Sequence, residues 1–204
     1  DGDIKMKVDL SKVIGAAFYW MGFHEFNEWR YLHRFLKADM VFFDVGSNQG
    51  EYSLFAAKRL TSGSVFAFEP VSSIYQRLQL NLSLNNFANI NTFRIGLSDN
   101  AGSLPIYMEE STSNNEGLAT IFQSKTRGRL VEEIQLETLD AIAARIEFNR
   151  IDFIKVDIEG AELKMLEGGR NTLKRFRPHV MVEMNEVTFN DAGYSTKDIL
   201  IYFD

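Results

Sequence analysis

Short apolar runs and segments with apolar residues at helical spacing alternate along most of this chain. The run MVFFDV, residues 40–45, is apolar at nearly every position, as buried parallel strands are. The segment GEYSLFAAKRL, residues 50–60, follows it and is typical of a helix. The same pattern predicts further strands at residues 64–70, 90–99, 151–158 and 179–185. It predicts further helices at residues 72–86, 136–146, 160–176 and 195–204. Such alternation indicates an α/β fold with a doubly wound, mostly parallel sheet and helices on both faces.

The segment before the first strand forms an addition to this plan. IKMKVDL, residues 4–10, can form a short edge strand, and NEWRYLHRFLKAD, residues 27–39, has apolar residues at helical spacing. We therefore expect two parts: an N-terminal strand/helix extension over residues 1–38 and the main domain over residues 39–204.

Two stretches after the third expected strand break the alternation. Residues 103–109, SLPIYME, predict an extra strand or hairpin. Residues 109–130 are polar and predict a long loop, and loops of that length in compact domains are usually functional. Residues 111–123 are the candidate lid over a bound acceptor.

Local signals add detail to two of the helices. Ser72 or Ser73 is expected to cap the helix that follows the second strand. Asn81 and Asn85 lie on one face of that helix, and we expect them to bond neighbouring backbone. The helix over residues 160–176 is expected to be interrupted near Gly168–Gly169.

Composition narrows the class of protein. The chain has 204 residues, 45% of them hydrophobic, which is enough for one sizeable core. There is no cysteine, which excludes a disulfide framework and a thiolate metal site and fits the cytoplasmic location that we expect. The net charge of −6 argues against general nucleic-acid binding. No apolar run approaches the roughly 20 residues that a membrane span needs, so no transmembrane segment is expected. The oligomeric state stays open.

Polar residues, most of them acidic, follow nearly every expected strand. Doubly wound sheets bind ligands at the carboxyl ends of their strands, so these residues are the first candidates for a site. They are Asp44, Glu69, Ser98, Asp99, Asp157, Glu159, Glu183 and Asn185. Acids at so many successive ends suggest a site that takes hydroxyls, amines or a cation.

The turn DVGSNQG, residues 44–50, distinguishes between two classes of cofactor. Its glycines are spaced G-x-x-x-G, which does not match the dinucleotide pattern G-x-G-x-x-G. A carboxylate at Asp44 would repel a pyrophosphate but attract the amino group and sulfonium of S-adenosylmethionine. Gly46 lets the backbone approach a ligand closely, and Gly50 lets the helix start tight against the strand. The turn therefore favours S-adenosylmethionine, with an NAD-dependent oxidoreductase as the alternative.

Several stretches together resemble the FkbM family of S-adenosylmethionine-dependent methyltransferases. They are FFDVGSNQGEYS, FEP, GLSD, TLDAI and above all IDFIKVDIEGAELKMLEGG, within residues 14–185. The resemblance implies a class I methyltransferase fold of the Rossmann-like type. It also implies O-methylation of a hydroxyl on a sugar, glycan or secondary metabolite. The family fold would add a final antiparallel hairpin after the helix that starts near Ser195, and the chain ends at Asp204 without it.

The resemblance also implies roles for residues at the cofactor. Asp44, Gly46, Asn48 and Gly50 would form the wall on the methionine side, and Glu69 would hold the ribose. An acid at the end of the second strand serves both cofactor classes, so Glu69 alone does not discriminate between them. The remaining expected contacts are Ser98 and Asp99 at the adenine, and Tyr52, Ser53 and Asp157 near the methionine part. The product would be S-adenosylhomocysteine.

Asp157 and Glu159 are the main candidates for catalysis, because they would lie beside the transferred methyl group. A positioned carboxylate helps an alcohol to lose its proton. We expect the two side chains to diverge, one toward the cofactor and one toward the acceptor. His24, with Glu25 beside it, is the next candidate, while His33 and His179 are expected to be structural.

Two alternatives stay open at this point. Asp157, Glu159, Glu183 and Asn185 are oxygen ligands that suit Mg or Ca, although we do not expect a metal. Glu183 and Asn185 are instead expected to line the pocket of a small-molecule or glycan acceptor. A catalytically inactive module that binds S-adenosylmethionine and acts by interaction is the alternative to an enzyme.

Overall fold

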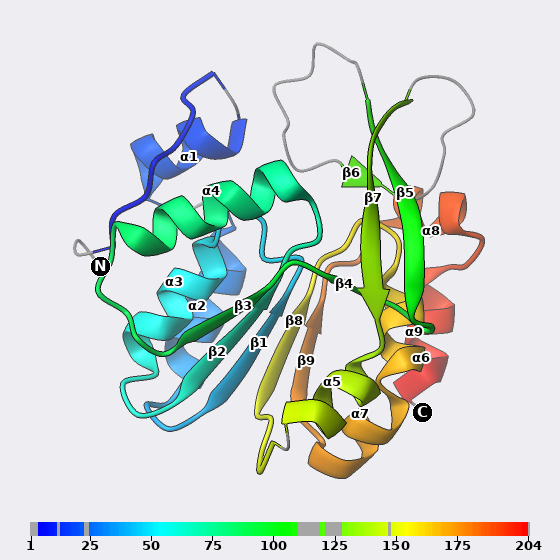
Figure 1. Ribbon diagram of the computed structural model, residues 1–204. Coiled ribbons are helices and arrows are strands. Elements are labelled where there is room, and N and C mark those ends of the chain that lie inside the picture. Colours follow the sequence, from blue (N-terminus) through cyan, green and yellow to red (C-terminus); the bar gives the residue numbers. More distant parts are fainter. Residues whose placement is uncertain are drawn as a thin grey trace.

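A five-stranded parallel sheet forms the centre of the protein in a computed structural model (Figure 1). The structure describes residues 4–11, 13–22, 25–109, 119–120, 128–146 and 148–203. The strand order is β3-β2-β1-β8-β9. These strands are β1 (Val41–Val45), β2 (Ser64–Phe68), β3 (Ile90–Phe93), β8 (Phe153–Val156) and β9 (His179–Val182). The order reverses between β1 and β8, which is where such sheets bind ligands.

Helices cover both faces of this sheet (Figure 1). On one side lie α2 (Phe26–Phe35), α3 (Glu51–Arg59) and α4 (Ser72–Ser83), preceded by α1 (Val13–Met21). On the other side lie α5 (Leu139–Ile146), α6 (Glu162–Gly168), α7 (Arg170–Phe176) and α9 (Thr196–Phe203). The doubly wound fold predicted from the sequence is therefore confirmed.

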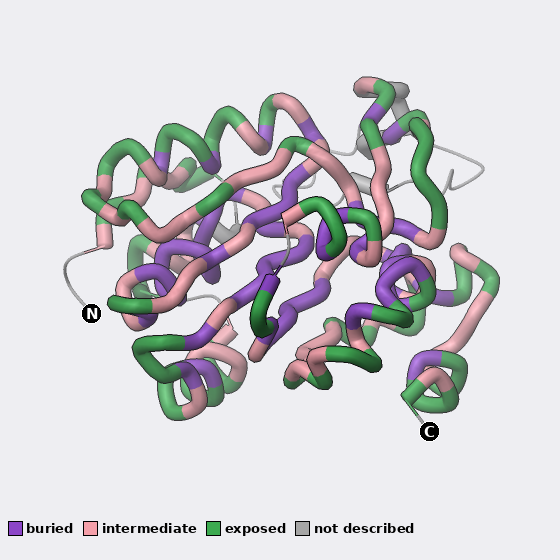
Figure 2. The backbone as a smooth tube through the Cα atoms, turned by 60° about the horizontal axis from the view of Figure 1, so that its bottom comes forward, coloured by how far each residue is buried: buried purple, intermediate pink, exposed green. Residues whose placement is uncertain are grey.

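Alternate strand residues supply the two halves of the core. Phe42 and Phe153 pack with the apolar side chains of α2 and α3, whereas Phe43 and Ile154 pack with those of α5 and α6. Successive side chains of a strand point to opposite faces, which is why both halves need apolar residues. Figure 2 shows the buried residues gathered in the sheet and on the inner sides of the helices.

A small second sheet follows β3. Its strand order is β4-β7-β5-β6, with β4 (Gly96–Leu97), β5 (Gly102–Glu109), β6 (Ala119–Thr120) and β7 (Gly128–Glu137). The expected extra hairpin is confirmed, because β5 pairs antiparallel with β7. Ile106 and Ile134 of this sheet pack against Val71 and Ile74. The candidate lid over residues 111–123 lies outside the described residues except for residues 119 and 120.

Two strand predictions differ from the structure. The expected strand over residues 90–99 is divided into β3 and β4, which belong to different sheets. Residues 4–10 form no strand; instead, the backbone N–H groups of Lys5 and Lys7 donate to the side chains of Asn85 and Asn81. The prediction that these two asparagines bond backbone is confirmed.

Helix termini follow the sequence in part. The interruption at Gly168–Gly169 is confirmed, because α6 ends there and α7 begins at Arg170. The expected serine cap of α4 is wrong, because no side chain caps this helix at Val71. Carboxylates of Glu69 and Glu132 accept from the first N–H groups instead. The helix α8 (Glu186–Ala192), capped by the Asn185 side chain, was not predicted.

Two further features concern the outside of the molecule. β9 is the outermost strand at one edge of the parallel sheet. Within the described ranges, no helix combines the length and the apolar character that crossing a bilayer requires.

Candidate active site

A cavity of about 390 Å³ lies at the carboxyl ends of the parallel strands. This volume is within the range of small-molecule pockets. The glycine turn, the start of α3, the end of β2, β4 and the turn after β8 form most of its wall. Three residues of the N-terminal extension complete it: Phe18, Glu25 and Trp29.

The glycine turn holds its backbone tight against the neighbouring strands. Gly46 has a φ of 77° and Gly50 a φ of 95°, both in the region that favours glycine. A Cβ atom at Gly46 would overlap the carbonyl oxygen of Asp157, and one at Gly50 would lie 2.6 Å from Leu78 Cδ1. Gly46 and Asn48 line the cavity, whereas Gly50 is not among its lining residues.

Asp44 lies beneath this turn rather than in the cavity wall. Its side chain is fully buried, and its Oδ2 atom accepts a hydrogen bond from Ser53 Oγ at 2.6 Å. Neither Asp44 nor Ser53 is among the residues that line the cavity. Burial raises the pKa of Asp44, partly offset by the charge of Lys155. Asp44 therefore does not line the cavity, whereas we expected it to form the wall on the methionine side of the cofactor.

Lys155 is a functional candidate that the sequence did not predict. It is the cross-strand neighbour of Asp44 in the β1–β8 register and is 5% exposed. Its Nζ atom lies 2.9 Å from Asp157 Oδ2 and 4.6 Å from the centroid of the Tyr52 ring. Burial by itself lowers the pKa of Lys155, but the charges of Asp157 and Asp44 raise it overall. Its position in the otherwise apolar run FIKV was the available signal.

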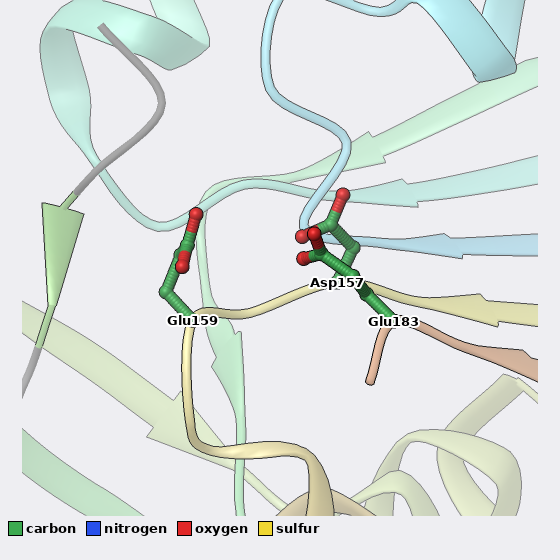
Figure 3. A group of neighbouring side chains, drawn as sticks. All are labelled: Asp157, Glu159 and Glu183. Carbon is green, nitrogen blue, oxygen red and sulfur yellow. The ribbon is translucent and has the colours of Figure 1, made fainter. Parts of the chain in front are cut away.

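Three carboxylates converge at the ends of β8 and β9 (Figure 3). Asp157, Glu159 and Glu183 each place one oxygen within 4.8 Å of the others. Glu159 has a φ of 51°, in the left-handed region. Figure 3 shows Asp157 and Glu183 side by side, with Glu159 set apart from them. That one of Asp157 and Glu159 faces the cofactor and the other the acceptor stays a prediction.

The close approach of these acids changes their proton affinity. Burial, together with the charge of Asp157, raises the pKa of Glu159 to about 7. Burial and a hydrogen bond to Asp157 raise the pKa of Glu183 far above its usual range. Such a pair of adjacent carboxyls holds a shared proton more tightly than either carboxyl would alone.

The donor set fits a divalent cation only in part. Three carboxylates within 4.8 Å offer the oxygen ligands that Mg or Ca prefers. The ammonium group of Lys155 already pairs with Asp157, one of the three.

Two further buried acids face the cavity. Glu69 is 5% exposed and accepts from the backbone N–H groups of Val71 and Asn48, so its position is fixed. Burial raises the pKa of Glu69 to about 7. Glu51, on the first turn of α3, was not predicted, and burial raises its pKa to about 7 as well. A glutamate directly after the glycine turn was the signal for it.

Of the other residues that we predicted to contact the cofactor, some line the cavity and others do not. Ser98 is buried in the wall, and its hydroxyl donates to Asp99, which is not a lining residue. Tyr52 lines the cavity and donates its hydroxyl hydrogen to Glu25. Asn185 also lines it while capping α8.

The histidines contribute nothing to the described wall. His24 lies outside the described residues. The ring of His179 packs against Phe35, with centroids 4.3 Å apart, and that of His33 lies 6.5 Å from Phe55. Neither His33 nor His179 lines this cavity, in agreement with their expected structural role.

The fold and the position of this cavity define the class. A parallel sheet of this order with a glycine turn after its central strand is the class I methyltransferase fold of the Rossmann-like type. The chain is similar to the crystal structure of Methyltransferase FkbM from Methylobacillus flagellatus, with a TM-score of 0.53 and 19% identity. The match covers 81% of this chain and 36% of that one. The sequence profile of the methyltransferase FkbM domain matches residues 44–204, so the chain belongs to this family.

Curated relatives include three methyltransferases with partial coverage. Methyltransferase sdnD of Sordaria araneosa is 29% identical, over 65% of this chain and 61% of its own length. Hexuronic acid methyltransferase AglP of Haloferax volcanii is 29% identical, over 80% and 61%. The 2-O-methyltransferase NoeI of Sinorhizobium fredii is 27% identical, over 69% and 62%. The chain thus spans about three fifths of the length of these relatives.

Proposed function

We propose that this protein is an S-adenosylmethionine-dependent O-methyltransferase that acts on a hydroxyl of a sugar, glycan or secondary metabolite. The observation that carries the proposal is the single cavity wall that joins the glycine turn and Glu69 to the carboxylates at the ends of β8 and β9. The names of AglP and NoeI, a hexuronic acid methyltransferase and a 2-O-methyltransferase, support a sugar-like acceptor.

The cavity has a suitable place for each part of the cofactor. Glu69 accepts one backbone N–H on each carboxylate oxygen and keeps lone pairs for the two ribose hydroxyls. Ser98 and the apolar wall beyond it suit the adenine, with Asp99 orienting the Ser98 hydroxyl. The backbone of Gly46 and Asn48 lies against the methionine part. Asp44, Gly50 and Ser53 support this turn from below.

The carboxylates then serve the acceptor. The cofactor would supply the methyl group: the hydroxyl oxygen would bond to the methyl carbon as the bond from carbon to sulfur breaks, which would leave S-adenosylhomocysteine and a proton for these residues to remove. Asp157 is the candidate base, because Lys155 favours its ionised form. Glu159 and Glu183 lie close enough to orient the same hydroxyl or to receive the proton. The protein's other contribution is to hold the reactants in line.

Calorimetry with S-adenosylmethionine, S-adenosylhomocysteine and NAD tests this proposal. We expect the first two to bind and NAD not to bind, because the turn lacks the dinucleotide pattern and is surrounded by acids. Tight binding of NAD without binding of the sulfonium compound would refute it. Transfer of a labelled methyl group to a panel of sugars and uronic acids then separates an enzyme from an inactive binding module. The cytoplasmic location and the two-part division at residue 38 stay predictions, and the oligomeric state stays open.

A further inference from the structure

Two of the three residues of the N-terminal extension that line the cavity carry polar groups, although both precede the first strand. They are Glu25, directly before α2, and Trp29 on its first turn. We propose that they bind the amino-acid end of the cofactor. Glu25 accepts from the α-ammonium group, and the indole N–H of Trp29 donates to the α-carboxylate. This inference rests on the proposed function, since it assumes that the cavity takes S-adenosylmethionine.

The indole N–H group of Trp29 makes no hydrogen bond to the part of the chain that the structure describes. Its Nε1 atom is also buried. The ring is held in place by Tyr52 and Phe55, with centroid distances of 5.5 Å and 4.5 Å. An indole N–H is a donor only, and a buried donor without an acceptor destabilises the protein. The indole N–H group can therefore donate a hydrogen bond to a ligand that carries an acceptor such as a carboxylate.

Glu25 supplies the opposite charge at the same place. Tyr52 donates its hydroxyl hydrogen to Glu25, which fixes the carboxylate beside the first turn of α3. An ionised carboxylate is acceptor-only and has capacity for further N–H donors. The ammonium group of Lys155 lies over the ring of the same Tyr52. A positive charge therefore lies near the position proposed for the ligand carboxylate. Lys155 is the one cation among the described lining residues.

The position of Glu69 indicates how the cofactor would be oriented in the cavity. β2 and β8 flank β1 on opposite sides, and Glu69 follows β2 whereas Lys155 is part of β8. The group of Lys155, Tyr52, Glu25 and Trp29 therefore lies across the glycine turn from Glu69. With the ribose at Glu69 and the adenine against the apolar wall beyond it, the amino-acid end points to this group. An ammonium and a carboxylate on one carbon need an acceptor and a donor, which Glu25 and Trp29 provide.

Calorimetry on the full chain with two probes tests the assignment. S-adenosylhomocysteine has the amino-acid end, whereas 5′-methylthioadenosine shares the adenosine and sulfur and lacks it. In Glu25→Gln and in Trp29→Phe, the affinity for S-adenosylhomocysteine should fall at least about tenfold, the usual effect of losing a bond to a charged group. The affinity for 5′-methylthioadenosine should stay within about twofold, because its contacts are untouched.

The chain provides a matched control for each variant. Glu28→Gln changes an acid on the same turn that does not line the cavity, and Trp20→Phe changes the other tryptophan, which is 78% exposed. Both should bind the two probes as the wild type does.

Unchanged binding of S-adenosylhomocysteine in Glu25→Gln and Trp29→Phe would overturn the inference. An equal loss for both probes would also overturn it, because the residues would then shape the whole cavity. If the wild type binds neither probe, the proposed function itself fails.

A second measurement keeps the assignment testable if a variant does not fold. In Trp20→Phe, Trp29 is the single tryptophan, so its fluorescence reports contact at the indole. S-adenosylhomocysteine should change the emission of Trp29, and saturating 5′-methylthioadenosine should change it much less. Equal changes with both probes, or none with S-adenosylhomocysteine, would contradict a contact between Trp29 and the amino-acid end.

Discussion

Gly46 and Gly22 have the same φ of 77°, but they differ in what surrounds them. A Cβ atom at Gly46 would overlap Asp157, whereas one at Gly22 would meet nothing within 4 Å. Gly46→Ala should therefore lower the free energy of unfolding by at least about 2 kcal/mol, from strain and overlap together. Gly22→Ala should lower it by about 1 kcal/mol, from strain alone. Urea unfolding measures both, and equal losses would show that the turn after β1 can relax away from β8.

The carboxylates at the ends of β8 and β9 are predicted to act on the acceptor rather than on the cofactor. Asp157→Asn and Glu183→Gln keep shape and remove charge. If Asp157 is the base, turnover of the accepted sugar should fall by about 10²–10⁴ in Asp157→Asn, while the affinity for S-adenosylhomocysteine stays close to that of the wild type. Labelled methyl transfer and calorimetry measure the two quantities.

Glu159→Gln and an exposed control complete this series. Glu167→Gln, on the solvent side of α6, should change neither quantity. If Asp157→Asn keeps normal turnover and Glu159→Gln loses it, the base is Glu159. If Asp157, Glu159 and Glu183 can each be neutralised without loss, these carboxylates are structural. Added Mg should not alter the ranking, because Lys155 already neutralises Asp157.

At the scale of elements, the side chain of Asn85 holds the N-terminal segment to the end of α4. Its Oδ1 atom accepts from Lys5 N at 2.9 Å, and its Nδ2 atom donates to Lys5 O at 2.8 Å. Asn85→Ala removes both bonds, each worth about 1 kcal/mol. We expect trypsin to cleave after Lys5 or Lys7 about tenfold faster in this variant, because the segment detaches more often. Mass spectrometry of a time course locates and times the cuts.

Asn86→Ala, at an exposed neighbouring position, is the control for this experiment. It should leave the cleavage rate unchanged. A rate that does not respond to Asn85→Ala would show that the apolar contacts of Ile4 hold the segment without the amide bonds.

The hydrophobic pattern predicted the central elements well because their environment imposes a simple rule. Strands such as β1 and β8 are buried on both faces, so nearly every residue has to be apolar. The rule fails where a partner is distant in sequence. Residues 4–8 alternate apolar and charged as a strand does, but their backbone partners are the side chains of Asn81 on α4 and of Asn85 just after it, which no local pattern reveals.

The candidate site was predictable to the extent that it follows strand ends. Glu69, Asp157 and Glu159 were found because carboxyl ends of parallel strands share one edge. The direction of each side chain was not predictable, which is why Asp44 proved to be buried beneath the turn and Glu183 to lie within 4.8 Å of Asp157. Trp29 fitted a packing stripe at helical spacing, and only its unpartnered Nε1 atom separates it from an ordinary core residue.

At the scale of the whole molecule, buried acids make stability depend on pH. Burial raises the pKa values of Glu51, Glu69 and Glu159 from 4.5 to about 7 in the folded chain. Between these values the folded state binds more protons than the unfolded state, so the free energy of unfolding falls as pH rises. We expect the melting temperature without ligand to be higher near pH 5 than near pH 8. A melting temperature that rises steadily over this range would contradict the burial of these acids.

The same three acids should make the protein discriminate between cofactor and product in a pH-dependent way. S-adenosylmethionine carries a positive sulfonium, whereas the sulfur of S-adenosylhomocysteine is neutral. As pH rises through 7, Glu51, Glu69 and Glu159 lose protons, and the cavity that they line becomes more negative. The preference for S-adenosylmethionine, measured as the ratio of the two dissociation constants, should therefore increase about tenfold from pH 6 to pH 8. Calorimetry at several pH values measures this ratio.

The double variant Glu51→Gln with Glu159→Gln is the control. Its ratio should depend less on pH, because two of the three titrating groups are gone. A ratio that is constant with pH in the wild type would mean that these acids do not face the sulfonium, and the methyl group would then have to lie elsewhere in the cavity.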